Sequence, residues 1–322
     1  MRILLTGCAG FVGWKTAELL LDQGYQVTGI DNLNDRYDCR LKTWRLDQLQ
    51  PRKGYTFQKC DIEDCAAMEQ LFGANAFDAV INLAAQSGVR ASVENPLVYF
   101  GTNAVGNLNV LECMRRHAIE KYVLASTSSL YAGQDMPFQE SLPVNKPISP
   151  YAASKKAAEA MAFTYHHLYG IDVSILRYFT AYGPAGRPDM APLRFVHRID
   201  RGKPITLYGD GSQSRDFTYI DDIANGTLSA LRKVGFEIIN LGGGRDPISI
   251  NRLIRRLENL LGKKAMLDQK PFLKVDMLHT WADISKARSL LGWKPKTTFE
   301  EGTRNLVDWY LAEREWARQL EF

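Results

Sequence analysis

A tyrosine and a lysine four residues apart, Tyr151 and Lys155, form the first pair in the sequence that could do chemistry. They follow Pro150 at the start of a predicted helix, and residues at positions i and i+4 lie on one helix face. A nearby ammonium favours phenolate over phenol and lowers the pKa of the tyrosine toward the working pH. We therefore interpret Tyr151 as a general base. A surface pair on an amphipathic helix is the alternative for these two residues alone.

A hydroxyl-rich segment, residues 126–129, follows an apolar run that we predict to be a strand. Sheets of the open α/β type bind ligands at the carboxyl ends of their strands. A hydroxyl at this place can share the proton of a reacting alcohol, so the segment is a candidate partner for the tyrosine and lysine. A solvated turn rich in serine and threonine is the competing interpretation.

A glycine loop with the spacing G-x-x-G-x-x-G, at Gly7, Gly10 and Gly13, follows the first predicted strand and opens a helix. Glycines permit a tight turn and close approach of the backbone, and a helix N-terminus offers free N–H groups to a pyrophosphate. Asp31, at the end of the second strand, can accept hydrogen bonds from ribose hydroxyls. Its charge would repel a 2′-phosphate, so the loop favours NAD over NADP, although Arg36 leaves NADP open. Ordinary turn glycines and a solvated aspartate are the alternative.

Further cofactor contacts are expected where the third and fourth strands end. Asp61 and Ile62 could hold the adenine, and small side chains after Asn82 could approach the cofactor. The full predicted cofactor set is Gly7, Gly10, Phe11, Val12, Gly13, Asp31, Asn32, Asp61, Ile62, Leu83, Ala84, Ala85, Tyr151, Lys155 and Tyr178.

The elements that must position these residues alternate between short apolar runs and helix-period stretches, which predicts an α/β fold. We expect a Rossmann-type, doubly wound parallel sheet with a smaller, mixed α/β substrate-binding domain. The predicted NAD-binding domain covers residues 1–178, and residues 179–322 form mainly the substrate-binding domain. Residues 216–242 are expected to rejoin the first domain, with 221–223 and 237–241 returning to the sheet. Predicted strands cover 2–5, 26–30, 56–60, 78–83, 122–125 and 172–177, and predicted helices 11–23, 63–72, 96–117, 151–169, 249–262, 283–291 and 299–318.

Composition narrows the possible settings. The chain has 322 residues, a net charge of +4 and scattered rather than clustered lysines and arginines, so we expect an anionic small ligand and no nucleic acid. No apolar run reaches the roughly 18 residues that a membrane helix needs. The 5 cysteines lack C-x-x-C spacing, which indicates no metal site and no disulfide framework and favours a cytoplasmic location.

The chain resembles the extended short-chain dehydrogenase/reductase family over nearly its whole length. The motifs that carry the resemblance are the glycine loop, Asp31, Asp61-Ile62, the hydroxyl–tyrosine–lysine set and Arg215-Asp216-Phe217-Thr218-Tyr219-Ile220-Asp221-Asp222. The resemblance implies that Thr127, Tyr151 and Lys155 are catalytic and that Arg215 contacts a substrate diphosphate. It also implies a homodimer in which the helices near 96–117 and 151–169 pair.

The resemblance also bears on the type of reaction. Sugar dehydratases and decarboxylases of this family carry acidic residues directly after the catalytic hydroxyl, whereas this chain has Ser128 and Ser129. Epimerisation is therefore expected: hydride leaves C4′ of the sugar, the 4-keto sugar turns over, and hydride returns to the opposite face. NAD would then be tightly bound and regenerated in each cycle.

The segments 31–38, 84–90 and 183–190 are most similar to those of UDP-glucuronate 4-epimerases, which convert UDP-glucuronate to UDP-galacturonate. By that resemblance Arg187 approaches the C6 carboxylate, and Ser128, Ser129 and Thr180 donate hydrogen bonds to it. These donors would protect a β-keto acid from losing carbon dioxide. A loop arginine that meets solvent or a phosphate is the alternative for Arg187. The predicted substrate set is Gln86, Arg90, Ser128, Ser129, Thr180, Arg187, Arg215 and Asp276.

Three other functions stay open at this point. The first is 4-epimerisation of UDP-glucose or UDP-N-acetylglucosamine, with Arg187 serving the diphosphate. The second is net oxidation or reduction of a nucleotide sugar, in which cofactor would be consumed stoichiometrically. The third is NAD sensing without turnover, which the intact tyrosine–lysine pair disfavours.

Overall fold

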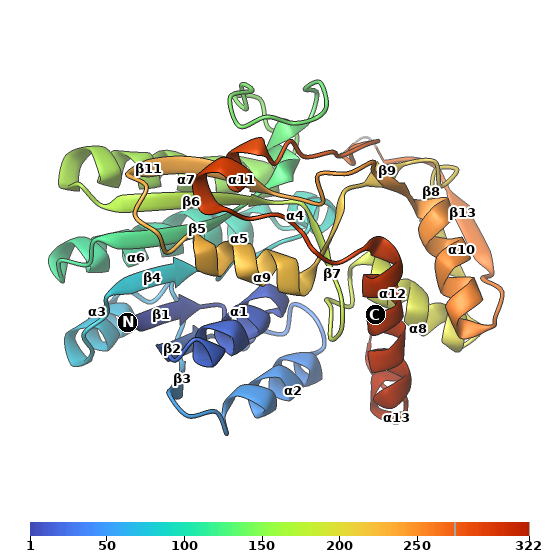
Figure 1. The fold of residues 1–322 in the computed structure, drawn as a ribbon, viewed down its shortest axis with the longest axis horizontal. Coiled ribbons are helices and arrows are strands. Elements are labelled where there is room, and N and C mark those ends of the chain that lie inside the picture. Colours follow the sequence, from blue (N-terminus) through green and yellow to red (C-terminus); the bar gives the residue numbers. More distant parts are fainter. Residues whose placement is uncertain (274, 322) are drawn as a thin grey trace.

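A seven-stranded sheet forms the centre of the molecule in the computed structural model, which describes residues 1–273 and 275–321 (Figure 1). Its strand order is β11-β6-β5-β4-β1-β2-β3, and every neighbouring pair is parallel. The expected α/β class and parallel sheet are therefore confirmed. The strands are β1 (Arg2–Thr6), β2 (Gln26–Asp31), β3 (Tyr55–Lys59), β4 (Ala79–Asn82), β5 (Lys121–Thr127), β6 (Asp172–Tyr178) and β11 (Phe236–Leu241).

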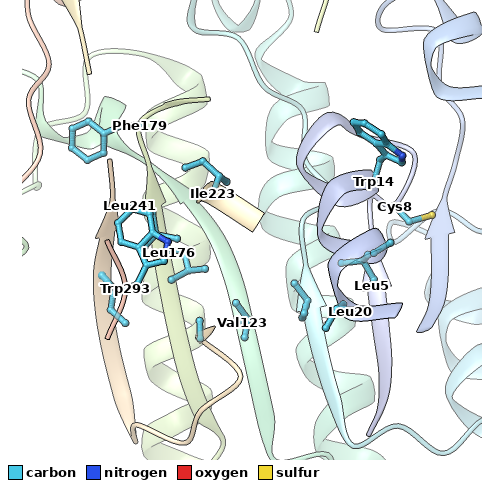
Figure 2. Close-up of a cluster of buried hydrophobic side chains, with 14 of the residues drawn as sticks. Leu5, Cys8, Trp14, Leu20, Val123, Leu176, Phe179, Ile223, Leu241 and Trp293 are labelled. Atoms are coloured by element: carbon cyan, nitrogen blue, oxygen red, sulfur yellow. The ribbon is translucent and has the colours of Figure 1, made fainter. Parts of the chain in front are cut away.

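Helices cover both faces of this sheet, because its central strands are apolar on both sides. Helices α1 (Phe11–Asp22), α2 (Cys39–Leu49), α9 (Ile220–Ser229) and α11 (Ser285–Leu291) contribute to one buried cluster with the sheet. Figure 2 shows part of that cluster, where Leu20 of α1 and Ile223 of α9 lie over the strands. Helices α3 (Cys65–Ala74), α6 (Asn107–Arg116) and α7 (Pro150–Tyr169) pack on the other face.

A second, smaller region lies beyond the carboxyl end of the sheet, on the right in Figure 1. Three helices build its core: α8 (Ala191–Asp200), α10 (Ile250–Leu261) and α12 (Phe299–Ala312), the last followed by the short α13 (Arg314–Ala317). Three two-stranded ladders accompany them. They pair β7 (Thr180–Tyr182) with β10 (Phe217–Tyr219), β9 (Ser214–Arg215) with β12 (Ile248–Ser249), and β8 (Ile205–Tyr208) with β13 (Leu267–Lys270).

Several predicted elements need correction. Residues 221–223 do not return as a strand, because they lie in α9, where Asp222 accepts backbone hydrogen bonds from Lys296 at 2.9 Å and Thr297 at 3.0 Å. The predicted helix over 96–117 comprises α5 (Pro96–Phe100), a π-helical turn (Gly101–Gly106) and α6. Helices α2, α8 and α4 (Val89–Glu94) were not predicted. No helix among the described residues is long and apolar enough to cross a membrane.

Candidate active site

A cleft of about 340 Å³ lies where β1, β2, β4 and β5 end, at the edge at which a parallel sheet of this kind binds ligands. Every residue predicted to contact the cofactor lines it. So do the three predicted catalytic residues and five of the predicted substrate residues, Gln86, Ser128, Ser129, Thr180 and Arg187. The structure thus brings together side chains from distant parts of the chain around one space.

The glycine loop forms a cradle that larger residues would fill. Gly7 has a φ of +68°, and a Cβ on it would stand 2.7 Å from the backbone nitrogen of Ala84. A Cβ on Gly13 would stand 2.0 Å from the carbonyl oxygen of Gly7. Gly10 begins α1 without a side-chain cap, so the first N–H groups of the helix face the cleft. These features fit the pyrophosphate of a dinucleotide.

Asp31 sits at the side of this cradle with its carboxylate already held. It accepts hydrogen bonds from the backbone N–H of Leu33 at 2.8 Å and of Ala9 at 3.2 Å. Lys42 of α2 lies 3.3 Å from the same carboxylate. Sequence reasoning missed Lys42 because it did not predict α2. Arg36 donates to the Tyr99 hydroxyl at 2.9 Å.

The predicted base lies in the first turn of α7. Pro150 occupies the first helical turn, and the Ser149 hydroxyl accepts from the backbone N–H of Ala152 at 3.1 Å. This cap fixes where the helix begins and so places Tyr151 and Lys155 at the cleft. The ammonium of Lys155 donates to the Ala125 carbonyl at 3.0 Å, at the end of β5. Burial lowers the pKa of Lys155 to about 8.

The predicted lowering of the tyrosine pKa by Lys155 is not observed. Burial raises the pKa of Tyr151 above its usual value, and the groups that oppose this rise are the Thr127 hydroxyl and the Arg187 guanidinium. The spacing placed Lys155 correctly, but its ammonium is committed to a backbone carbonyl. Desolvation of the phenol therefore outweighs the stabilisation of its charged form.

A buried ionic network, which the sequence did not reveal, lies behind the lysine. Glu159 accepts two hydrogen bonds from Arg177, at 2.9 and 2.8 Å, and one from Ser126 at 2.6 Å. Glu159 is 2% exposed, and its charge partly offsets the effect of burial on the Lys155 pKa. The pair thus ties α7 to the ends of β5 and β6. Its sequence signal is a glutamate one helical turn beyond Lys155, on the same face.

Arg187 enters the cleft from the loop after β7. Its guanidinium pairs with Asp189 through two nitrogens and donates to the Ser87 hydroxyl. Its charge also opposes the rise of the Tyr151 pKa, so the two side chains interact electrostatically. A guanidinium therefore lies near the predicted base, and Ser128 and Ser129 line the same cleft.

Comparison with known proteins identifies the family. The model of the family described as GDP-mannose 4,6 dehydratase matches residues 4–306. The chain belongs to this family. The UDP-glucuronate 4-epimerase of Thermodesulfobacterium geofontis is 55% identical to it over 306 residues, which is 95% of each chain.

Two solved structures show how closely this member of the family follows known folds. The structure of UDP-glucuronic acid 4-epimerase from Bacillus cereus, in complex with UDP-glucuronic acid and NAD, has a TM-score of 0.91 and 36% identity over 97% of this chain and 99% of that one. The UDP-glucose 4-epimerase of Thermotoga maritima, solved with UDP-glucose, has a TM-score of 0.88 and 32% identity over 98% of this chain and 100% of that one.

The remaining predicted substrate residues of this family member lie outside the lining of that cleft. Arg90 pairs with Asp276 at 3.0 Å through Nε, and its guanidinium lies 4.1 Å from the ring centre of Tyr208. Arg215 donates to the carbonyls of Ser214 at 2.9 Å and Leu278 at 3.2 Å. Burial lowers the pKa of Arg215, Asp276 opposes this, and Arg90 adds to it. Arg90, Arg215 and Asp276 thus form a second charged group.

Proposed function

We propose that this protein is an NAD-dependent UDP-sugar 4-epimerase that converts UDP-glucuronate to UDP-galacturonate. The observation that carries the proposal is Arg187 beside Tyr151 in one cleft, at a place where a carboxylate on the sugar could meet a cation while its C4′ hydroxyl meets the base. The 55% identity to the UDP-glucuronate 4-epimerase of T. geofontis supports the same activity.

The acid–base work falls to Tyr151 and Thr127. The Thr127 hydroxyl opposes the rise of the Tyr151 pKa, and both side chains line the cleft. Tyr151 takes the proton of the C4′ hydroxyl when the sugar is oxidised and gives it back when the sugar is reduced. Removal of the proton depends on lowering a phenol pKa that burial raises, so Thr127 and the nearby cations contribute directly to the rate.

The cofactor fits the cradle by the chemistry of its donors. The glycine loop would hold the pyrophosphate, Asp31 and Lys42 the adenosine ribose, and Asp61 with Ile62 the adenine. Lys155, buried at the end of β5, would hold the nicotinamide ribose. Bound NAD would supply a reversible acceptor for the C4′ hydride. Because each cycle returns that hydride to the sugar, the protein needs no exchange of cofactor.

The hydroxyls of Ser128, Ser129 and Thr180 would donate to the C6 carboxylate together with Arg187. A carboxylate held by several donors cannot easily reach the orientation in which C5–C6 cleavage is assisted by the C4 ketone. Gln86 would contact the sugar from the other wall. The second charged group, Arg90, Arg215 and Asp276, would meet the diphosphate at the nucleotide end.

The proposal extends to organisation. Residues 1–178, with 216–242, would form the NAD-binding domain and 179–322 mainly the sugar domain. Two copies would pair through the helices around 96–117 and 151–169, whose outer faces expose large apolar side chains, and such surfaces commonly mark interfaces. These side chains are Leu97, Phe100, Val105, Leu108 and Phe163. A cytoplasmic location would suit the 5 cysteines, all of which are unpaired.

The deciding experiment incubates the purified protein with UDP-glucuronate, without added NAD, and resolves the products by chromatography and proton NMR. UDP-galacturonate is the expected product. UDP-xylose or a 4-keto pentose would show that the carboxylate is not protected. Conversion of UDP-glucose or UDP-N-acetylglucosamine in parallel tubes, with UDP-glucuronate unchanged, would leave the epimerase chemistry intact and refute the assignment of Arg187.

A further inference from the structure

Arg187 has no free edge for a second carboxylate. Its Nε lies 3.0 Å from Oδ1 of Asp189, and one terminal nitrogen pairs with Oδ2 of the same carboxylate. The other terminal nitrogen donates to the Ser87 hydroxyl, and the Ser87 carbonyl lies 3.5 Å from the guanidinium. A guanidinium binds a carboxylate strongly by presenting two parallel N–H groups. A sugar carboxylate can use that geometry only if Asp189 leaves it.

The backbone just before Arg187 is held by hydrogen bonds, which favours a rearrangement of side chains over one of the loop. Arg45, which is fully buried, donates to the carbonyls of Ala185 at 2.8 Å and Gly186 at 3.2 Å. It also donates to the carbonyl of Ala9, in the glycine loop, at 2.9 Å. The loop that carries Arg187 is thereby tied to the cofactor cradle.

Asp189 is partly exposed and has a second cation nearby. Its side chain is 46% exposed, whereas that of Arg187 is 20% exposed, so the carboxylate lies at the rim and the guanidinium deeper. Arg36 and Asp189 flank Gly88, since an Arg36 nitrogen and an Asp189 oxygen both lie 4.0 Å from the position of a Cβ on that glycine. Arg36 already contributes to keeping the pKa of Asp189 low.

We propose that Asp189 is the resident counter-ion of Arg187, that the C6 carboxylate of the sugar displaces it, and that Asp189 then turns to Arg36. This inference rests on the proposed function, because it assumes an acidic sugar. Exchange of one carboxylate for another makes Arg187 selective. A neutral sugar leaves the Arg187–Asp189 pair intact. An acidic sugar replaces Asp189 and accepts hydrogen bonds from the two N–H groups that Asp189 leaves.

Binding measurements on the NAD-loaded Tyr151→Phe protein test the exchange without turnover. UDP-glucuronate and UDP-glucose are titrated calorimetrically into this protein and into versions that also carry Asp189→Asn or Asp35→Asn. Asp35→Asn removes the same charge from an exposed position next to Arg36 and outside the cleft lining. We expect Asp189→Asn to tighten UDP-glucuronate binding about threefold to fivefold, because the competing carboxylate is gone, and to change UDP-glucose binding less than twofold. Asp35→Asn should change neither.

Equal effects of Asp189→Asn on both sugars, or weaker binding of UDP-glucuronate, would overturn the exchange and make Asp189 a support of the loop. Arg36→Gln, at an exposed residue, is the second variant. It should weaken UDP-glucuronate binding and spare UDP-glucose, and an unchanged preference would contradict the role of Arg36. The turnover experiment with unmodified protein separates the two claims. Absence of UDP-galacturonate would refute the proposed function, whereas the ratio of the two affinities reports on the exchange alone.

Discussion

The two ends of the cleft are built in different ways. At the cofactor end, the ligand would meet mainly backbone, in a loop where Cβ atoms added to its three glycines would stand 2.0 to 3.0 Å from the neighbouring backbone. At the sugar end, it would meet charged side chains that already hold one another, Arg187 with Asp189 and Arg90 with Asp276. A site made of backbone is specified by short sequence spacing. A site made of ion pairs depends on which side chains meet across the fold, and its partners can exchange.

The two ends of the cleft also differ in the ligand exchange that each must allow. The cofactor end is closely packed around its glycine loop, which suits a ligand that stays bound through every cycle. The sugar end must release a product and accept a substrate that differs only in the configuration of one carbon. An ion pair whose carboxylate the substrate can replace would meet that need, because the arginine keeps a partner with and without the sugar.

The largest effect is expected at the boundary between the two ends, for Tyr151→Phe. Loss of the phenolic hydroxyl removes the acid–base group, and such groups contribute about 10²–10⁴-fold to rates. We expect kcat to fall by about 10³-fold while the protein still retains NAD and still binds UDP-sugars. The measurement is kcat by product NMR together with the absorbance of copurified cofactor. Full activity of Tyr151→Phe would mean that another residue is the general base, and the assignment of Tyr151 would be wrong.

Arg187→Met tests the sugar end alone. The variant keeps much of the side-chain volume but cannot form the charged hydrogen bonds, each of which contributes about 1.5–3 kcal/mol. We expect kcat/KM for UDP-glucuronate to fall about 10- to 100-fold, with UDP-glucose affected less than threefold. Competition between the two sugars in one tube measures the ratio directly. A parallel loss for both would place Arg187 at the diphosphate instead.

Gly13→Ala tests the cofactor end. Its Cβ would stand 2.0 Å from the Gly7 carbonyl oxygen, so the loop must deform. We expect a loss of about 3 kcal/mol in stability and loss of copurified NAD, read from urea unfolding and from absorbance. Gly73→Ala in α3 is the matched control, since its nearest non-local atom is 4.0 Å away. Retention of NAD by Gly13→Ala would show that the cradle is softer than its contacts indicate.

Every residue that the sequence assigned to the cofactor lines the cleft, and that assignment stays a prediction. Particular residues explain where the sequence failed elsewhere. Strands β1 to β6 were found because short apolar runs alternate with helix-period stretches in the sequence. Helix α2 was missed because two of the residues it buries, Lys42 and Arg45, are charged. They interrupt the pattern of apolar residues by which a helix is predicted. These residues are buried because they serve Asp31 and the loop at Ala185.

At the sugar end, residue types were predicted but their partners were not. The Arg90–Asp276 pair joins residues 186 positions apart, which no local spacing reveals. The pKa of Tyr151 was predicted in the wrong direction, because the i, i+4 spacing shows the cation but not the burial of the phenol. Long-range contact and desolvation are properties of the folded chain, so they enter only with the structure.

The smallest effect concerns Lys155, which we expect to carry a stability cost for the sake of function. Burial depresses its pKa from 10.5 to about 8, so at neutral pH a charged group is held in an apolar place. Lys155→Met should therefore raise the stability at pH 7 by about 1–2 kcal/mol while it slows epimerisation. Urea unfolding of this variant and of unmodified protein measures the difference.

The difference in stability between Lys155→Met and unmodified protein should depend on pH. Between pH 8 and 10.5, the unfolded chain holds more protons at this lysine than the folded chain, so the stability of unmodified protein rises relative to Lys155→Met as pH increases through this window. The advantage of the variant should shrink toward pH 10. If the difference in unfolding free energy between the two proteins did not change with pH, burial would not depress the pKa of Lys155. The cofactor end would then carry no greater electrostatic cost than the sugar end.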